Sequence, residues 1–164
     1  MIAIEPARSS DFSLIQTFAY RTWPETYGGI LSKKQLDFML DKFYSLENLQ
    51  LNVTQNQLFY IIYDNEIPIG FLGIQHHFEQ KPITKIHKIY VLPNNQKKGI
   101  GKSAIEFVVH NALKNQSEKI ILNVNRFNKA VVFYQKMNFK IVQEIDISIG
   151  NNYLMEDFIM EMSL

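Results

Sequence analysis

One stretch of the sequence restricts the possible folds more than any other: residues 85–114, where a predicted strand leads through a glycine-containing loop into a predicted helix. Residues 85–92 are rich in β-branched and aromatic side chains, which favour a strand. Pro93 has no backbone N–H to donate, so the strand ends there. Beyond the loop, apolar residues recur at helical spacing and predict one buried helix face: Ile100, Ala104, Ile105, Val108, Val109, Ala112 and Leu113.

The loop has the features of an anion-binding site. Gly99 and Gly101 stand where the loop becomes the helix, and the first turn of a helix has backbone N–H groups without an intrahelical partner. Glycines there remove side chains that would hold a ligand away from these donors. Lys97, Lys98 and Lys102 add positive charge beside the positive end of the helix dipole. The loop therefore predicts a site for a phosphate or pyrophosphate.

Two common phosphate-binding motifs fit the loop incompletely. Residues 101–103 give the Gly-Lys-Ser of a P-loop, but its first glycine would fall at Gln96, and the predicted strand 120–125 ends in asparagine instead of a magnesium-binding aspartate. Residues 99–104 match the dinucleotide pattern Gly-x-Gly-x-x-Ala. Residues 93–98, however, separate its first glycine from the strand, and no acidic residue ends the next strand.

A third motif fits at each specified position. Residues 96–101, Gln-Lys-Lys-Gly-Ile-Gly, resemble the Gln/Arg-x-x-Gly-x-Gly/Ala loop of the GCN5-related N-acetyltransferases (GNAT), which cradles the pyrophosphate of acetyl-coenzyme A. Residues 123–139 resemble a second block of that family: a strand, then Asn-x-x-Ala-x-x-Phe-Tyr, then a short lysine-bearing link. Because the order and spacing of the two blocks both fit, the resemblance is more than a match to one short motif.

The resemblance implies an α/β (α+β) fold, the GNAT fold, in which four helices flank a central, mixed but mostly antiparallel sheet of about seven strands that is splayed near its middle. Local patterns give the same order of elements, β-α-α-β-β-β-α-β-α-β-β, in one domain over residues 1–164. They predict an edge strand over 2–7, a helix after 9–11 that is broken by 23–30, a helix capped by Ser32, a hairpin over 57–64 and 66–76, a helix capped by Asn128, and closing strands over 139–147 and 152–162. Residues 46–55 fit either a helical turn or a loop.

The resemblance also implies residues that bind acetyl-CoA. Backbone groups of Ile89, Tyr90 and Val91 are expected to pair with the pantetheine arm, and Asn128 is expected to hydrogen-bond the cofactor, cap its helix, or do both. Asn123 is a candidate for the pantetheine or the substrate. The remaining expected cofactor-binding residues are Gln96, Lys97, Lys98, Gly99, Ile100, Gly101, Lys102, Ser103 and Tyr134.

The implied reaction is acetyl transfer to a primary amine by direct attack in a ternary complex, and it needs an acid and a base. Tyr134 occupies the family's tyrosine and is the expected general acid, whose phenol donates to the departing sulfur. Many relatives have a glutamate where this chain has Lys85. The base is therefore expected to be His87, which has a suitable ordinary pKa, or Glu25 acting through water, or solvent itself.

The expected acceptor is a polyamine or another small cationic amine. Five acids and no Lys or Arg lie in residues 141–164, and Trp23, Glu25 and Tyr27 belong to a segment that the resemblance places over the acceptor site. Trp23 and Tyr27 fit ordinary helix packing equally well. The alternatives are a non-catalytic acyl-CoA-binding regulatory module, a protein or peptide N-acetyltransferase, and an ATP-dependent phosphotransferase.

Composition excludes other classes of protein. The chain has no cysteine, so it forms no disulfide, thiolate zinc site or cysteine nucleophile. The adjacent His76 and His77 would point to opposite faces of a strand, and no metal is expected. A net charge of +1 gives no case for nucleic-acid binding. With no signal peptide or ~18-residue apolar run, we expect a cytoplasmic protein, a monomer or homodimer, with no membrane partner.

Overall fold

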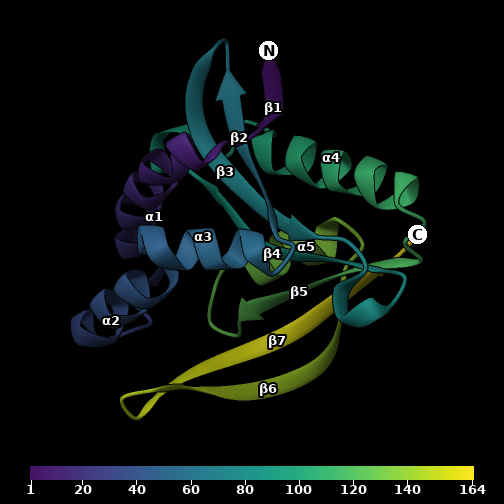
Figure 1. Ribbon diagram of the computed structural model, residues 1–164. Helices are drawn as coiled ribbons and strands as arrows, with labels where there is room; N and C mark the ends of the chain where they lie inside the picture. Colours follow the sequence, from purple (N-terminus) through teal and green to yellow (C-terminus); the bar gives the residue numbers. More distant parts are fainter.

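The computed structural model describes residues 1–164 and contains one seven-stranded mixed sheet in the order β1-β2-β3-β4-β5-β7-β6. Helices α1 to α3 cover one face, and α4 and α5 cover the other (Figure 1). The strands are β1 Ile2–Pro6, β2 Leu58–Asp64, β3 Ile67–Gln75, β4 Ile83–Val91, β5 Lys119–Asn125, β6 Lys140–Gly150 and β7 Tyr153–Ser163. The helices are α1 Phe12–Tyr27, α2 Lys33–Tyr44, α3 Leu46–Thr54, α4 Ile100–Lys114 and α5 Ala130–Lys136. None of these helices is both long and apolar enough to cross a membrane.

The predicted splay of the sheet is confirmed by the pairing of β4 with β5. These two parallel strands pair only between Ile83–Ile86 and residues 119–122, while every other neighbouring pair is antiparallel. The pairing of β3 with β4 shifts register so that Gly73 faces Lys88 but Ile74 faces Ile86. His87 is thus the extra residue of a bulge, which bends a strand and increases its twist. Beyond His87, β4 and β5 diverge and leave a fork in the sheet.

Two expectations about the helices were wrong. The sequence predicted four helices, but residues 46–54 form a fifth, α3, whose start is capped by Ser45 Oγ accepting from Asn48 N at 3.1 Å. The expected break at Trp23 is absent, because α1 continues through Pro24 to Tyr27. A proline inside a helix costs about 3 kcal/mol. Trp23 and Tyr27 are both buried here, and each large apolar side chain contributes about 1.5–3 kcal/mol on burial, so together they offset that cost.

The core has one main apolar cluster on each side of the sheet. On the α1–α3 side, Trp23, Tyr44 and Phe71 are among the buried residues. On the α4–α5 side the buried residues include Ile105 and Phe139. The predicted buried face of α4 is correct for Ile100, Ala104, Ile105, Val108 and Ala112, but Leu113, in the last turn, is more than half exposed.

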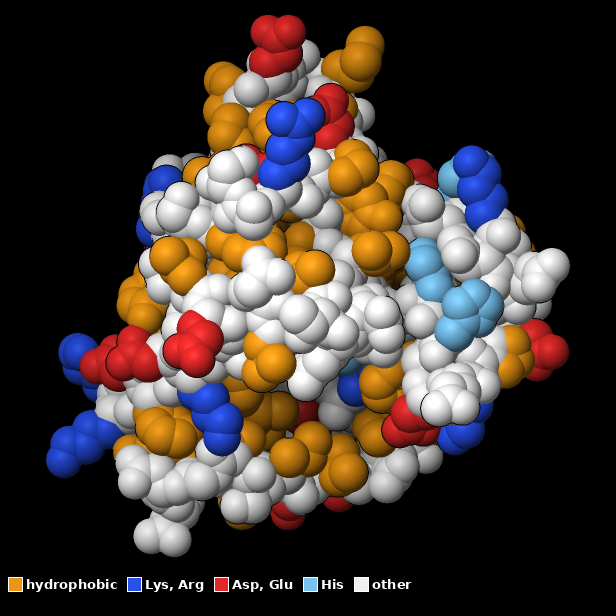
Figure 2. Space-filling model, viewed as in Figure 1, with side chains coloured by type: hydrophobic (Ala, Val, Ile, Leu, Met, Phe, Trp, Pro, Cys, Tyr) orange, Lys and Arg blue, Asp and Glu red, His pale blue; other side chains and the backbone are white.

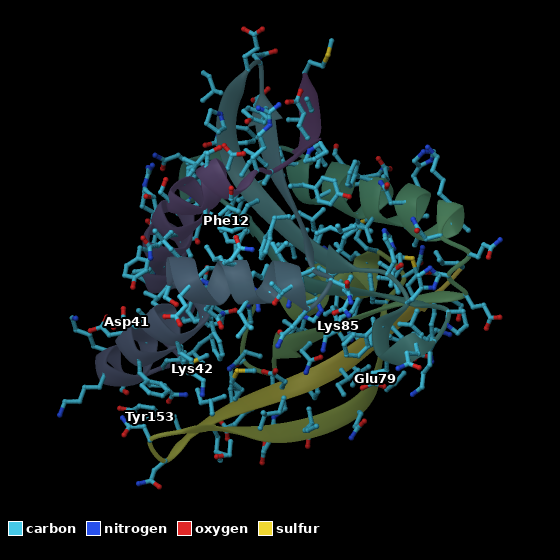
Figure 3. All side chains as sticks on the ribbon, viewed as in Figure 1. Phe12, Asp41, Lys42, Glu79, Lys85 and Tyr153 are labelled. Carbon is cyan, nitrogen blue, oxygen red and sulfur yellow. The ribbon has the colours of Figure 1, made fainter.

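The β6–β7 hairpin extends beneath α2, where polar and aromatic contacts hold it. Gln35 Nε2 donates to the Leu154 carbonyl at 2.9 Å, and the ammonium of Lys42 donates to the Ile149 carbonyl. The rings of Phe38 and Tyr153 lie 5.3 Å apart. Figure 3 labels Lys42 and Tyr153 at this junction. The hairpin therefore closes one side of the space below the α1–α3 layer.

Replacement of Gly70 by alanine tests the close approach of β3 to β4. A Cβ at Gly70 would lie 2.4 Å from the Tyr90 carbonyl oxygen, so the strand backbones would have to move apart. We expect Gly70→Ala to lower the free energy of unfolding by about 1–3 kcal/mol in urea titrations. Gly29→Ala is the matched control, since nothing lies within 4 Å of its added Cβ, and its effect should stay within about 0.5 kcal/mol. Equal stability of the two variants would contradict this account of the strand spacing.

Candidate active site

The fork between β4 and β5 is the centre of the candidate site. Since the pairing ends at Ile86 and Leu122, the edge of β4 from His87 to Val91 that faces away from β3 has no strand beside it. The loop after β4 leads directly into α4, and α5 follows β5 by a short connection. Main-chain groups of β4, the start of α4 and the side chains of α5 therefore meet around one opening. Leu92 N donates to the Ile69 carbonyl, so by antiparallel alternation the main-chain groups of Tyr90 face Phe71 of β3, and those of Ile89 and Val91 face the open edge. Pairing of these residues with the pantetheine arm stays a prediction.

The loop before α4 presents a row of free backbone donors. None of the six amides from Lys97 to Lys102 donates to another group of the protein, and the first hydrogen bond of the helix runs from Ser103 N to Gly99 O at 3.1 Å. Gly99 has φ 76°, which glycine adopts without strain. The Lys97, Lys98 and Lys102 side chains are exposed at this end of the helix. This arrangement fits a diphosphate, because free amides, the helix dipole and cationic side chains all favour an anion there.

Two loop residues do more than the motif suggests. Gln96 Nε2 donates to the Val91 carbonyl at 3.0 Å and ties the loop to the end of β4. A Cβ on Gly101 would lie 3.0 Å from Cζ of Phe133, whereas nothing lies within 4 Å of one on Gly99. Gly101 therefore has a packing role in addition to its expected role in cofactor binding. Its lack of a side chain lets the Phe133 ring of α5 pack on the first turn of α4, which fixes α5 beside the loop.

Asn123 and Asn128 both lie at the fork. Leu122 and Val124 pack in the α4–α5 cluster, so by alternation Asn123 points to the α1–α3 side. Asn128 Oδ1 accepts from Ala130 N at 2.9 Å, but the residue at the N-cap of α5 is Lys129, so Asn128 lies one position before the predicted cap. Only Lys129 separates Asn128 from Ala130, one residue fewer than in the family's Asn-x-x-Ala, and the hydrogen bond accordingly spans two residues.

Tyr134 projects from α5 and is buried against Phe139, with the two rings 5.7 Å apart and edge to face. Burial, together with the nearby Tyr27 hydroxyl, raises the pKa of Tyr134 above that of a free phenol. The phenol therefore keeps its proton at neutral pH. A group in that state can donate a proton but does not accept one as a phenolate.

Aromatic side chains from the opposite side of the sheet meet Tyr134 through the fork. The hydroxyls of Tyr27 in α1 and Tyr90 in β4 are 2.9 Å apart, and Trp23 packs on both rings at 4.8 and 6.0 Å. Burial raises the pKa of Tyr27, and hydrogen bonding with Tyr90 and Asn128 opposes this rise. The structure thus brings Trp23 and Tyr27 to the site, where Trp23 is a packing residue whose indole N–H has no hydrogen-bond partner.

Neither of the two side chains expected to act as the base, His87 and Glu25, is suited to that role in the structure. His87 Nε2 lies 2.9 Å from Gln75 Oε1, and burial, followed by the charges of Lys85 and Lys88, lowers the pKa of His87 to about 3. His87 is therefore neutral at pH 7 and too weak to hold a substrate proton. Glu25 is exposed, on the side of α1 opposite the buried Trp23 and Tyr27, so the structure does not bring it into the site.

Lys85 lies on the sheet face below α1–α3. Its ammonium is 4.5 Å from the centre of the Phe78 ring, and burial lowers the pKa of Lys85 while the charges of Glu79 and Asp157 raise it. Figure 3 labels Lys85 and Glu79 on the same side of the molecule.

His76 Nδ1 pairs with Thr84 Oγ1 at 2.7 Å, and no three potential metal-ligating side chains come together anywhere in the chain.

Sequence reasoning missed Asp157, a buried carboxylate on β7. Tyr153 and Met155 of β7 pack toward α1 and α2, whereas Met160 packs toward α4 and α5, so alternation directs Asp157 to the α1–α3 side. Burial raises the pKa of Asp157, while hydrogen bonding from Asn123 and the charges of Arg126 and Lys85 lower it. The signal in the sequence was this alternation, which separates Asp157 from the exposed acids of the same segment.

Comparison with known proteins agrees with this architecture. Residues 55–141 match the acetyltransferase (GNAT) domain family. The uncharacterised N-acetyltransferase YlbP of Bacillus subtilis (strain 168) is 27% identical over an alignment of 122 positions that covers 68% of this chain and 72% of that protein.

Two solved structures share the fold over nearly the whole length of both chains. The PaiA N-acetyltransferase of Thermoplasma acidophilum, determined in complex with coenzyme A, is 24% identical with a TM-score of 0.83, and the match covers 100% of this chain and 99% of that one. The ribosomal-protein-S18-alanine N-acetyltransferase of Escherichia coli is 17% identical with a TM-score of 0.73, covering 99% and 94%. The family match, supported by the shared fold, shows that this chain belongs to the GNAT acetyltransferases and is an acetyl-CoA-dependent N-acetyltransferase.

Proposed function

We propose that this protein transfers the acetyl group of acetyl-CoA to the primary amine of a small cationic acceptor, such as a polyamine. The observation that carries the proposal is the fork between β4 and β5. The free amides of Lys97–Lys102 and the protonated Tyr134 phenol lie on one side of this opening, and buried polar groups lie on the other side of the sheet. Donor and acceptor can therefore approach one opening from two sides, as direct attack in a ternary complex requires.

The loop and the strand edge supply the donor side of the site. The amides of Lys97 to Lys102, including those of Ile100 and Gly101, hold the diphosphate, with the three nearby ammonium groups adding charge. The free edge of β4 at Ile89 offers main-chain groups to the pantetheine arm, while the Val91 carbonyl is already bonded to Gln96. The bound thioester supplies an activated acyl group. Ile100 is buried, so its amide rather than its side chain takes part.

Tyr134 is the proposed general acid. In the transfer, the amine nitrogen bonds to the thioester carbonyl carbon, the carbon–sulfur bond breaks, and the departing sulfur takes the phenolic proton. The proton that the nitrogen loses as it becomes an amide then restores the Tyr134 phenol. Burial raises the pKa of Tyr134, so the phenol still carries its proton when the sulfur departs. A non-catalytic acyl-CoA-binding module would have no use for a protonated phenol beside the phosphate loop, so this feature favours the enzyme.

The acceptor side is the space below the α1–α3 layer. Tyr27 and Tyr90 present their hydroxyls at the fork, and Asn123 and Asp157 face the same side. These groups are polar or acidic, which suits a cationic amine better than an anionic one. The polyamine identity, a cytoplasmic location and the monomeric or homodimeric state stay predictions.

Tyr134→Phe tests the reaction directly. Wild-type protein should release coenzyme A from acetyl-CoA with at least one member of a panel of polyamines, monoamines and peptides. The variant should lose about 10²-fold in kcat, because the sulfur then has no positioned proton donor, while its Kd for coenzyme A stays within about twofold.

Tyr60→Phe is the matched control, since it deletes a hydroxyl from a tyrosine packed on Phe107, away from the fork. Full turnover by Tyr134→Phe would remove Tyr134 as the acid. Failure of the wild type with every amine and peptide would overturn the proposed acetyl transfer.

The lysines of the loop are expected to contribute charge to cofactor binding. Neither Lys97 nor Lys98 forms an ion pair within the protein, so replacing both by glutamine should raise the Kd for coenzyme A about tenfold in low salt and less in high salt. Isothermal titration at two salt concentrations measures this. The double replacement of Lys34 and Lys140, exposed and unpaired lysines on α2 and β6, is the control. If both pairs affected binding equally, the charge of the loop would have no specific role.

A further inference from the structure

Asp157 is a buried carboxylate that the reaction described so far does not use. Its residue is only 5% exposed, yet its side chain belongs to none of the ion pairs of the protein. Asn123 on β5, a diagonal neighbour across the strand pair, lowers the pKa of Asp157 through side-chain hydrogen bonding. A carboxylate removed from water without a cation is unfavourable. A positively charged ligand would therefore stabilise the Asp157 carboxylate, because the protein itself supplies no ion-pair partner.

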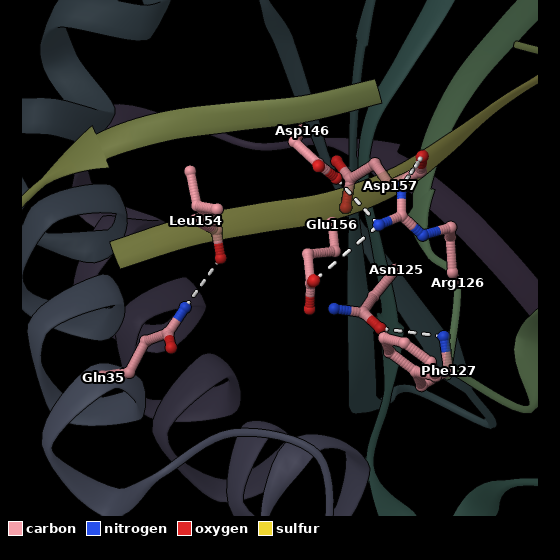
Figure 4. A network of polar contacts seen from close by, with 8 residues as sticks. All are labelled: Gln35, Asn125, Arg126, Phe127, Asp146, Leu154, Glu156 and Asp157. Carbon is pink, nitrogen blue, oxygen red and sulfur yellow. Dashed lines mark hydrogen bonds and ion pairs between the residues drawn. The ribbon is translucent and has the colours of Figure 1, made fainter. Parts of the chain in front are cut away.

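The cations nearest to Asp157 are engaged elsewhere. The Arg126 guanidinium contacts Asp146 at 2.7 Å and Glu156 at 3.8 Å, and reaches only the backbone carbonyl of Asp157, at 3.4 Å (Figure 4). The Lys85 ammonium lies over the Phe78 ring and is within the field of Glu79. Neither cation comes within ion-pair distance of the Asp157 carboxylate, although both act on it from further away.

The surroundings of Asp157 place it beside the proposed reaction centre. Asp157 lies opposite Asn125, the last residue of β5, and the charge of Asp157 raises the pKa of Tyr27, whose hydroxyl lies 2.9 Å from that of Tyr90. The titratable or charged groups that face Asp157 are thus Tyr27 from α1, Lys85 from β4 and Arg126 after β5. Figure 2 shows this face hollowed between the helices and the β6–β7 hairpin, with acidic and basic atoms visible inside the hollow.

We propose that Asp157 receives the acceptor as a primary ammonium ion and takes one of its protons, which leaves the neutral amine for attack at Tyr134. This inference rests on the proposed acetyl transfer. The proton passes from the ammonium nitrogen to a carboxylate oxygen, directly or through one water, and leaves to solvent after the amide has formed. The carboxylate comes from β7, and the cationic Lys85 comes from β4. The acceptor class that fits is an amine that is positively charged at neutral pH.

Burial raises the pKa of Asp157 toward the range in which a carboxylate accepts a proton from an ammonium group more readily. The carboxylate must be deprotonated to act. The value of kcat/KM should therefore fall as the pH drops through the pKa of Asp157. Asp157→Asn should abolish that dependence and leave only the titration of the amine itself.

The kinetic test compares Asp157→Asn with Glu161→Gln. Glu161 lies four residues along the same face of β7, but its carboxylate is paired with Lys119 at 3.1 Å, so its replacement removes equal charge outside the site. We expect Asp157→Asn to lower kcat/KM for a cationic amine about 10²-fold at pH 7, with the KM for acetyl-CoA within about twofold. Glu161→Gln should stay within about twofold in both. Equal kcat/KM for Asp157→Asn and wild type would overturn the proposal.

A second measurement on wild-type protein does not depend on turnover or on the folding of a variant. In the complex with coenzyme A, carboxyl ¹³C NMR should show the pKa of Asp157 falling when propylammonium is added, because a bound cation favours the charged carboxylate. This result in a protein that acetylates no amine would support amine recognition at Asp157 while removing the acetyl transfer. An Asp157 signal that ignores propylammonium would contradict the proposal even if the enzyme turns over.

Discussion

The early end of the pairing between β4 and β5 is the constraint on which the site depends. Had the two strands continued beyond Ile86 and Leu122, main-chain hydrogen bonds would have closed the sheet and separated its two faces. The open fork instead leaves a strand edge free and lets Tyr134, from the α4–α5 side, approach Tyr27 and Tyr90, from the α1–α3 side. Because β4 and β5 do not form these hydrogen bonds, the sheet has an opening in which groups from its two faces come together.

The fork is held open by the elements around it. The bulge at His87 bends β4, and Gly70 allows the β3 and β4 backbones to stay close after that bend. On the other side, β5 remains fully paired with β7, and Phe133 packs on the helix turn at Gly101. Because each contact involves a strand or helix and not a mobile loop, the donor and acceptor sides are positioned before either ligand binds.

The motifs predicted the strand–loop–helix unit and the place of Tyr134, and local strand and turn patterns predicted the hairpins. These features depend on residues close together in the sequence, such as Gly99, whose positive φ favours glycine. The features that depend on distant packing were missed. Local propensity breaks α1 at Pro24, but burial of Trp23 and Tyr27 carries the helix through. The ordinary pKa of histidine suggested a base at His87, but burial and two lysines keep it neutral. In the sequence, Asp157 is one of several acids in a charged segment, and only its place on the inward-facing side of β7 shows that it is buried.

A crystal structure of the protein with coenzyme A is the most direct test of the account. It predicts diphosphate oxygens bonded to the free amides between Lys97 and Lys102, and a pantetheine arm along the unpaired edge of β4, with the pairing of β4 to β5 still ending at Ile86 and Leu122. Coenzyme A bound elsewhere, or β4 and β5 paired along their full length with the ligand in place, would contradict the account.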